Sequence, residues 1–333
     1  MDEKLERRML RKNYSPLGWA LFVYLLILNA CVLVFAIVDM VVIAFSQLNG
    51  GTHTEEELSN ILMQNGWGYM VSIAVGLIAL RLWKGKKFFR ETLWTKGKPM
   101  QAGDFFCLLA LFLAGQLAFS LIAEAMEAFF NLFGLSVLDS IESATMSADS
   151  FSMFLYAGIG APIAEEILFR GLVLRHLEPY GKRFAIVMSA FAFAVFHGNL
   201  VQIPYAFLVG LILGYTAVEH NILWAIVLHM INNLVLADML TRLTSLLPEL
   251  IGNGILGMVI LASAMAAIVI LIVRRDEVRA YRQANRIDGK HTAAFFTSPG
   301  IIALLIFVLF TVASPLVDQI AANMAQAAVL ILP

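Results

Sequence analysis

Apolar stretches long enough to cross a lipid bilayer recur along almost the whole chain, and they restrict its fold more than any other feature. Spanning the hydrocarbon core takes about 20 helical residues, and every backbone N–H and C=O inside it needs an internal partner. We therefore expect an all-α fold, a polytopic membrane helix bundle of about nine transmembrane helices, with eight as the alternative count. The nine predicted spans are 17–45, 67–83, 103–124, 151–174, 184–200, 203–219, 221–240, 252–273 and 296–317.

The composition agrees with an integral, multi-pass membrane protein. Hydrophobic residues make up 60% of the 333-residue chain, charged residues 14%, and the mean hydropathy is +0.81. A soluble globular domain carries about 25% charged and 45–50% apolar residues. The lipid bilayer is therefore an expected partner. Nucleic acid is not, because the basic clusters flank apolar segments and lack interleaved aromatic motifs.

Lys and Arg are distributed unevenly between the predicted connections. Segments 47–66 and 125–150 contain acids but no Lys or Arg, whereas 84–100, 274–290 and the N-terminal stretch are basic. Cytoplasmic loops carry the excess of Lys and Arg. The pattern therefore predicts a cytoplasmic N-terminus and, with nine spans, a C-terminus on the outside. We expect the membrane to be a bacterial plasma membrane.

Three parts of the chain are predicted from the positions of the polar residues. Residues 1–100 form an N-terminal cytoplasmic segment and two transmembrane helices, 101–245 a catalytic helical core, and 246–333 the C-terminal transmembrane helices. The motifs of the core lie within 160–235. A charged side chain at the bilayer centre costs roughly 2.5–3.5 kcal/mol, so such residues usually face a bundle interior and mark a site.

Two adjacent carboxylates, Glu165 and Glu166, lie inside the fourth predicted span. Residues four apart share a face of a helix, so Glu166 and Arg170 are predicted to pair and support the site. Glu165 points elsewhere and has no partner in its own helix. It is therefore the candidate general base, because desolvation brings the pKa of a carboxyl closer to the working pH. Pro162 predicts a kink just before the two acids.

The same four-residue step recurs in two later spans. Phe193 and His197 share a face of the fifth helix, so the ring of Phe193 can pack beside the imidazole and support it. His229 and Asn233 share a face of the seventh helix. Two polar side chains that converge on one point can serve as an oxyanion hole. Without a kink or displaced helix start, Glu165 and His197 differ in depth by several ångströms.

These motifs, Glu165-Glu166-x-x-x-Arg170, Phe193-x-x-x-His197 and His229-x-x-x-Asn233, resemble in their order those of the CAAX-protease and bacteriocin-processing (CPBP) family. The resemblance covers roughly residues 150–240. It implies that Glu165 activates the attacking water together with His197, and that His229 and Asn233 stabilise the oxyanion. The substrate is then a peptide or a membrane protein, and nothing in the residues implies that it is prenylated.

We expect no cofactor, with zinc as the alternative. Glu165, His197 and His229 have the composition of a three-ligand His₂Glu zinc site. Asn233, stacked with His229, fits an oxyanion donor better than a zinc ligand. Glu165 would also be consumed as a ligand, which leaves no second base.

Three classes of function remain open at this point. The favoured one is an intramembrane endopeptidase of glutamic type that cuts a peptide bond near the cytoplasmic side, with a metalloprotease as the mechanistic alternative. The second is a catalytically idle scaffold or peptide-immunity protein of the same family. The third is a proton-coupled transporter, because buried acids and histidines also form proton relays. No paired broken helices or repeat halves support that third class.

Overall fold

The computed structural model describes residues 3–52, 54–145 and 148–331, and no strand occurs within these ranges. The predicted all-α membrane bundle is confirmed. The longer helices are α1 (Glu3–Leu48), α3 (Trp67–Lys87), α4 (Ala102–Asn131), α9 (Lys182–Phe196), α10 (Gln202–Glu219), α13 (Glu249–Val273), α14 (Arg275–Ala284) and α16 (Pro299–Ile331). The shorter α-helices are α2 (Glu55–Met63), α5 (Leu138–Thr145), α6 (Phe151–Leu155), α7 (Ala161–Glu166), α8 (Arg175–Leu177), α11 (Ile222–Met230), α12 (Thr241–Ser245) and α15 (Gly289–Phe296). The π and 3₁₀ segments are η1 (Phe88–Thr92), η2 (Tyr156–Gly160), η3 (Ile167–Leu174), η4 (Glu178–Tyr180) and η5 (Ile231–Leu240).

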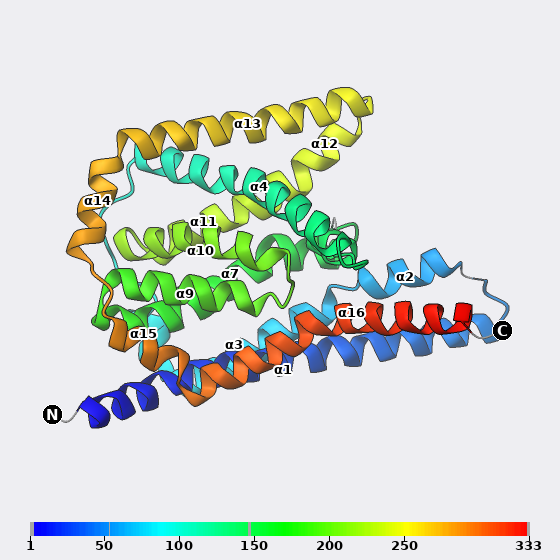
Figure 1. Cartoon of the computed structure of the whole chain (residues 1–333), viewed down its shortest axis with the longest axis horizontal. Helices are drawn as coiled ribbons and strands as arrows, with labels where there is room; N and C mark the ends of the chain where they lie inside the picture. The colour runs from blue at the N-terminus through cyan, green and yellow to red at the C-terminus, as the bar shows by residue number, and fades with distance from the viewer. Residues whose placement is uncertain (1–2, 53, 146–147, 332–333) are drawn as a thin grey trace.

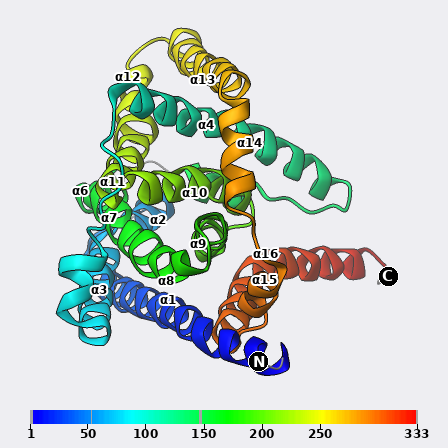
Figure 2. The ribbon, with the colours of Figure 1, turned by 90° about the vertical axis from the view of Figure 1, so that its left-hand side faces the viewer.

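The helices form three layers, which Figures 1 and 2 show from two directions. One outer layer pairs α4 with α13, and the other packs α1 against α3 and α16. The central layer holds α7, α9, α10 and α11. Every motif residue comes from this central layer, from the π segments that continue its helices or, in the case of His197, from the position directly after α9.

Six helical segments are long and apolar enough to cross a membrane: Glu3–Leu48, Asn60–Thr92, Ala102–Asn131, Gln202–Glu219, Glu249–Val273 and Pro299–Gln326. The nine predicted spans therefore exceed the number that meet this criterion. The other three, 151–174, 184–200 and 221–240, are helical but belong to the central layer. The first carries three charged side chains, and the second corresponds to α9, which has only 15 residues. Neighbouring helices surround these segments, so they need less length and hydrophobicity than a helix exposed to lipid.

The two ends of the bundle differ in charge. The N-terminus and α14 lie at one end of the long axis, and the C-terminal end of α16 lies at the other (Figure 1). Both the N-terminal stretch and the sequence around α14 are rich in Lys and Arg. The two basic segments thus share one end of the molecule, as the predicted orientation requires. The prediction that this end is cytoplasmic remains a prediction.

The outer layer of α1 and α16 depends on a very close backbone contact. A Cβ added to Gly18 would collide with the backbone of Gly300, and a Cβ on Gly300 would collide with the carbonyl oxygen of Ser15 and the amide nitrogen of Trp19. The amide of Gly300 also donates a 3.0 Å hydrogen bond to the Ser15 hydroxyl. Small residues allow helices in membranes to approach in this way.

The helices that carry the motifs contain more π-helical backbone than the sequence predicts. The segment η2 precedes the two glutamates and η3 follows them, while η5 begins just after His229. A π turn leaves local backbone groups outside the regular ladder and is frequent at functional sites. Pro162 contributes to the first of these irregularities, because it has no N–H to donate.

Candidate active site

Glu166 and Arg170 form the predicted ion pair at the centre of the bundle. Arg170 Nη1 lies 2.9 Å from Glu166 Oε1, and both side chains are 0% exposed. Two further contacts hold the guanidinium: Nη2 donates to the carbonyl oxygen of Gly210 at 3.1 Å, and Cζ lies 4.4 Å from the centre of the Phe193 ring. A buried ion pair offsets its desolvation cost only when such additional contacts satisfy it.

The structure adds a third member to this pair, which the sequence did not predict. His229 Nδ1 lies 3.0 Å from the same Glu166 oxygen that binds Arg170. The other ring nitrogen of His229, Nε2, lies 3.7 Å from Glu165 Oε2. The two adjacent glutamates therefore contact opposite sides of one imidazole. The spacing of residues along a helix predicts contacts within it, and α7 and α11 come together only in the folded bundle.

The two glutamates differ in their exposure to solvent. The side chain of Glu165 is 19% exposed, while that of Glu166 is fully buried. Glu165 has no hydrogen-bonding partner in the described part of its own helix, and its contact with His229 is longer than a hydrogen bond. Glu165 is therefore the more accessible of the two carboxylates.

Phe193 joins the second motif to the other two. His197 Nδ1 lies 2.8 Å from the Phe193 carbonyl oxygen, and the rings of these residues meet edge to face at 4.8 Å. The Phe193 ring also meets His229 edge to face, at 5.8 Å between ring centres. The predicted packing of Phe193 against His197 is confirmed. His197 follows the last residue of α9, and Phe193 connects it to His229.

The hydrogen bonds of the two imidazoles determine which ring nitrogen carries the proton. A carbonyl oxygen and an ionised carboxylate can only accept, so Nδ1 of His197 and Nδ1 of His229 both donate. When each ring is neutral, its Nε2 then carries a free lone pair. His229 Nε2 becomes a donor only when the ring is protonated.

Asn233 binds backbone rather than pointing freely into the site. Its Nδ2 donates to the carbonyl oxygen of Ala157 at 2.8 Å. In the π register of η2, Ala161 N–H bonds Tyr156 O, so the next residue would bond Ala157 O. That residue is Pro162, which has no N–H. Asn233 therefore supplies the donor that Pro162 lacks.

A chain of polar side chains fixes the amide of Asn233. Asn232 Nδ2 donates to Asn233 Oδ1 at 3.0 Å, and Gln116 Nε2 donates to Asn232 Oδ1 at 2.9 Å. Gln116 also lies 2.9 Å from the hydroxyl of Tyr205. The sequence offered a weak signal for this network, namely amides inside apolar stretches. The partners come from α4, α10 and η5, and only the packing of these helices reveals that they meet.

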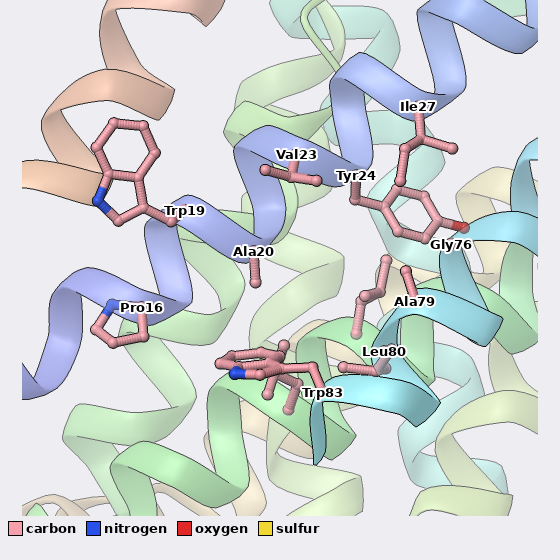
Figure 3. A pocket seen from close by; sticks show the side chains of 12 residues that line it. Pro16, Trp19, Ala20, Val23, Tyr24, Ile27, Gly76, Ala79, Leu80 and Trp83 are labelled. Atoms are coloured by element: carbon pink, nitrogen blue, oxygen red, sulfur yellow. The ribbon is translucent and has the colours of Figure 1, made fainter. Parts of the chain in front are cut away.

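An apolar groove runs between α1 and α3 on one side of the motif helices. Figure 3 shows Tyr24 of α1 pointing across it toward Gly76 of α3. Its volume is about 410 Å³, and it is lined by Pro16, Trp19, Ala20, Val23, Tyr24, Ile27, Gly76, Ala79, Leu80, Trp83, Leu168 and Leu172. Leu168 and Leu172 follow Glu165 by three and seven residues on the same stretch of helix. The groove therefore reaches the helix that carries the candidate base.

The zinc alternative meets one of two structural requirements. The donor chemistry fits, because both imidazoles bind an acceptor through Nδ1, as metal-binding histidines usually do, and leave Nε2 as the ligand atom. The arrangement does not fit as it stands: within residues 3–52, 54–145 and 148–331 no three His, Cys, Asp or Glu side chains are grouped to hold a metal ion.

An all-α membrane bundle that holds a buried carboxylate, a more accessible one and two imidazoles is compatible with the general class of intramembrane hydrolases. Residues 147–235 match the family model described as type II CAAX prenyl endopeptidase Rce1-like. The resemblance to the CPBP family is thereby confirmed over the stretch that carries the three motifs, and the match supports an intramembrane CAAX-type protease. Neither a search of curated proteins nor a search of solved structures gave a match.

Proposed function

We propose that the chain is an intramembrane endopeptidase that hydrolyses a peptide bond with water activated by Glu165, near the cytoplasmic side of the membrane. The observation that carries this proposal is the position of His229 between the two glutamates. Glu166 holds one ring nitrogen at 3.0 Å, and Glu165 stands 3.7 Å from the other. A nucleophilic water placed there has a carboxylate to take its proton and an imidazole beside it.

The proposed reaction uses the motif residues in separate roles. Water loses a proton to Glu165 while its oxygen attacks the carbonyl carbon of the substrate, with His197 helping to hold the water. The oxyanion that forms is stabilised by protonated His229 and by the free N–H of Asn233. Glu165 then returns the proton to the amide nitrogen, the C–N bond breaks, and the two peptides leave. Glu166, Arg170 and Phe193 keep His229 in place.

The apolar groove supports a substrate that reaches the site from within the bilayer. Tyr24 lies in the groove and packs against Phe196 at 5.9 Å, and Phe196 is the residue just before His197. A peptide with an apolar segment can therefore lie along α1 and α3 with its scissile bond near Glu165. The name of the matched family refers to prenylated CAAX substrates. An apolar groove is compatible with such a group and equally with apolar side chains.

The lone pair on Nε2 of each histidine is the observation that favours a zinc hydrolase as the second candidate. In that case His197, His229 and Glu165 would hold the ion, and zinc would supply a Lewis acid and an acidified water. Incubating the purified protein with a chelator distinguishes the two. Under the metal-free proposal turnover stays unchanged. Loss of turnover with a chelator, restored by stoichiometric zinc, would establish the metalloprotease instead.

A substrate screen with matched variants tests the proposed function directly. Purified protein is incubated with a library of membrane-anchored peptides, and cleavage is followed by mass spectrometry. Glu165→Gln keeps the shape but cannot take a proton, so turnover is expected to fall by about 10²–10⁴-fold with thermal stability retained. Wild-type protein that cuts nothing in the library would favour the idle scaffold or immunity protein. Proton flux across proteoliposomes, without cleavage, would favour the transporter.

A further inference from the structure

Helix α14 carries arginines in a pattern that the proposed function does not use. Arg275, Arg279 and Arg282 are spaced four and three residues apart, so they share one face of the helix. Arg286 follows in the turn just beyond its end, and all four side chains are exposed. We call these four residues the arginine stripe.

The charges of the stripe are largely uncompensated. Arg275 makes a loose contact with its neighbour Asp276, at 3.8 Å between two side chains that are about three-quarters exposed. In the described part of the chain, Arg279, Arg282 and Arg286 make no ion pair. Structural arginines in this protein behave differently: Arg274, one residue before the helix, binds Asp104 in the first turn of α4 at 3.0 Å. The stripe therefore has charge available for a partner outside the chain.

The depth of the stripe is fixed by the helices on both sides of it. Only Arg274 separates α14 from the end of α13, a helix long and apolar enough to span a membrane. Figure 2 looks onto this end of the molecule and shows α14 running across it. The stripe thus lies where a spanning helix leaves the hydrocarbon, which is the level of the lipid headgroups.

A buried contact keeps α14 against the bundle. The hydroxyl of Tyr281 donates to Glu219 Oε1 at the end of α10, at 3.1 Å, and its ring packs against Tyr215 at 5.5 Å. Lys182 binds the same carboxylate oxygen at 2.8 Å. Burial and the nearby Glu219 carboxylate raise the pKa of Tyr281, so the hydroxyl stays protonated and continues to donate. Tyr281 is not part of the stripe, which points away from this anchoring contact.

We propose that the arginine stripe binds the phosphate groups of anionic membrane lipids. Guanidinium groups form two parallel hydrogen bonds to phosphate and are less strongly hydrated than ammonium groups. Clusters of four to eight basic residues directly beside a transmembrane helix are typical of anionic lipid recognition. A lipid is favoured over an acidic protein because α14 is held at headgroup depth, where lipid phosphates are always within reach.

Lipid retention by the intact purified protein tests this proposal without any peptide substrate. The protein is prepared in a neutral detergent, phosphatidylglycerol or phosphatidylcholine is added, and bound lipid is measured by native mass spectrometry. We expect phosphatidylglycerol to bind more tightly. Each Arg→Gln change in the stripe is expected to weaken it by about fivefold, since one basic side chain near the surface contributes about that factor. Arg→Lys changes keep the charge and should retain most of the binding.

A matched control separates the stripe from the general positive charge of this protein. It carries the same number of neutralised basic side chains in another basic segment: Lys86→Gln, Lys87→Gln, Arg90→Gln and Lys96→Gln, all at exposed positions. The proposal predicts normal phosphatidylglycerol binding by this control. Equal losses in both variants, or full binding by the stripe variant, would overturn it. Displacement of the lipid by millimolar inorganic phosphate would mean that the stripe recognises free phosphate, and tighter binding of an acidic peptide would mean a protein partner; either result would also overturn it.

Discussion

Glu166 accepts a hydrogen bond from Nδ1 of His229 at 3.0 Å, through the same oxygen atom that binds Arg170. One buried carboxylate thus neutralises an arginine on its own helix and orients a histidine from another. The four-residue spacing predicts that Glu166 is a structural partner of Arg170. It does not predict the second contact of Glu166, with His229. Substitutions of Glu166 should therefore have two separable effects, one on the stability of the protein and one on the orientation of the His229 imidazole.

Removing the charge of Glu166 should primarily reduce stability. Glu166→Gln leaves Arg170 uncompensated in the interior, and breaking a buried pair in this way costs roughly 3–5 kcal/mol. The double variant Glu166→Gln with Arg170→Met leaves no orphan charge and should recover part of the loss. Thermal unfolding in one detergent, analysed as a double-mutant cycle, measures this. Equal unfolding temperatures for wild type and Glu166→Gln would contradict the pairing.

A third variant isolates the effect on His229. In Glu166→Gln the oxygen of the new amide still accepts from Nδ1, whereas the leucine side chain of Glu166→Leu has no acceptor. Glu166→Leu with Arg170→Met should therefore unfold like Glu166→Gln with Arg170→Met, yet turn over about 10–100-fold more slowly, the range found when an outer partner of a functional histidine is lost. Similar turnover in the two double variants would show that Glu166 does not orient His229 for the reaction.

The close contact between α1 and α16 predicts a stability effect far from the site. Gly300→Ala would place a methyl group against the backbone of Ser15 and Trp19, which cannot move aside as a side chain can. Overpacking of this kind costs about 1–3 kcal/mol. Gly257→Ala is the matched control, since a Cβ there meets nothing within 4 Å. A Gly300→Ala protein with the unfolding temperature of the Gly257→Ala control would show that this contact can relax.

The sequence predicts the candidate site better than it predicts the arrangement of the helices around it. Contacts within one helix follow from spacing alone, so Glu166 with Arg170 and Phe193 with His197 were predictable and are confirmed. Contacts between helices depend on packing and rotation. Neither the bond from His229 to Glu166 nor that from Asn233 to Ala157 has a signal in the spacing of residues.

The number of predicted spans shows that hydropathy is limited in the same way: it does not reveal how the helices pack. A hydropathy window treats every apolar stretch as if it faced lipid, which is correct for α1 or α13. It overestimates the exposure to lipid of a helix such as α9, because most side chains of α9 are buried by protein neighbours. The π segments were missed for another reason, because π turns arise from tertiary contacts and not from the periodicity of apolar residues.

The predicted orientation is tested by cysteine labelling in intact cells. Cys31→Ala and Cys107→Ala first remove the native thiols, which are partly exposed. A cysteine at Asn60 should then react with an impermeant maleimide and one at Thr95 should not, because Lys- and Arg-rich connections stay in the cytoplasm. Both positions are exposed in the structure, so access within the protein is comparable. The opposite labelling pattern would reverse the topology and place the site near the outer face.

The amide network behind Asn233 gives the last prediction. Asn232→Leu removes the donor that fixes Asn233 and the acceptor for Gln116, and a buried polar group left without a partner costs about 1–3 kcal/mol. We expect lower stability and a lower kcat with little change in KM, because Asn233 would act on the transition state. Adding Gln116→Leu should not restore kcat, since it removes an amide that has lost one of its two acceptors without fixing Asn233. Asn29→Leu, the same change at an exposed position of α1 whose amide bonds only its own helix, is the control and should alter neither quantity. Recovery of kcat in the double variant would show that the network stabilises the bundle without positioning Asn233.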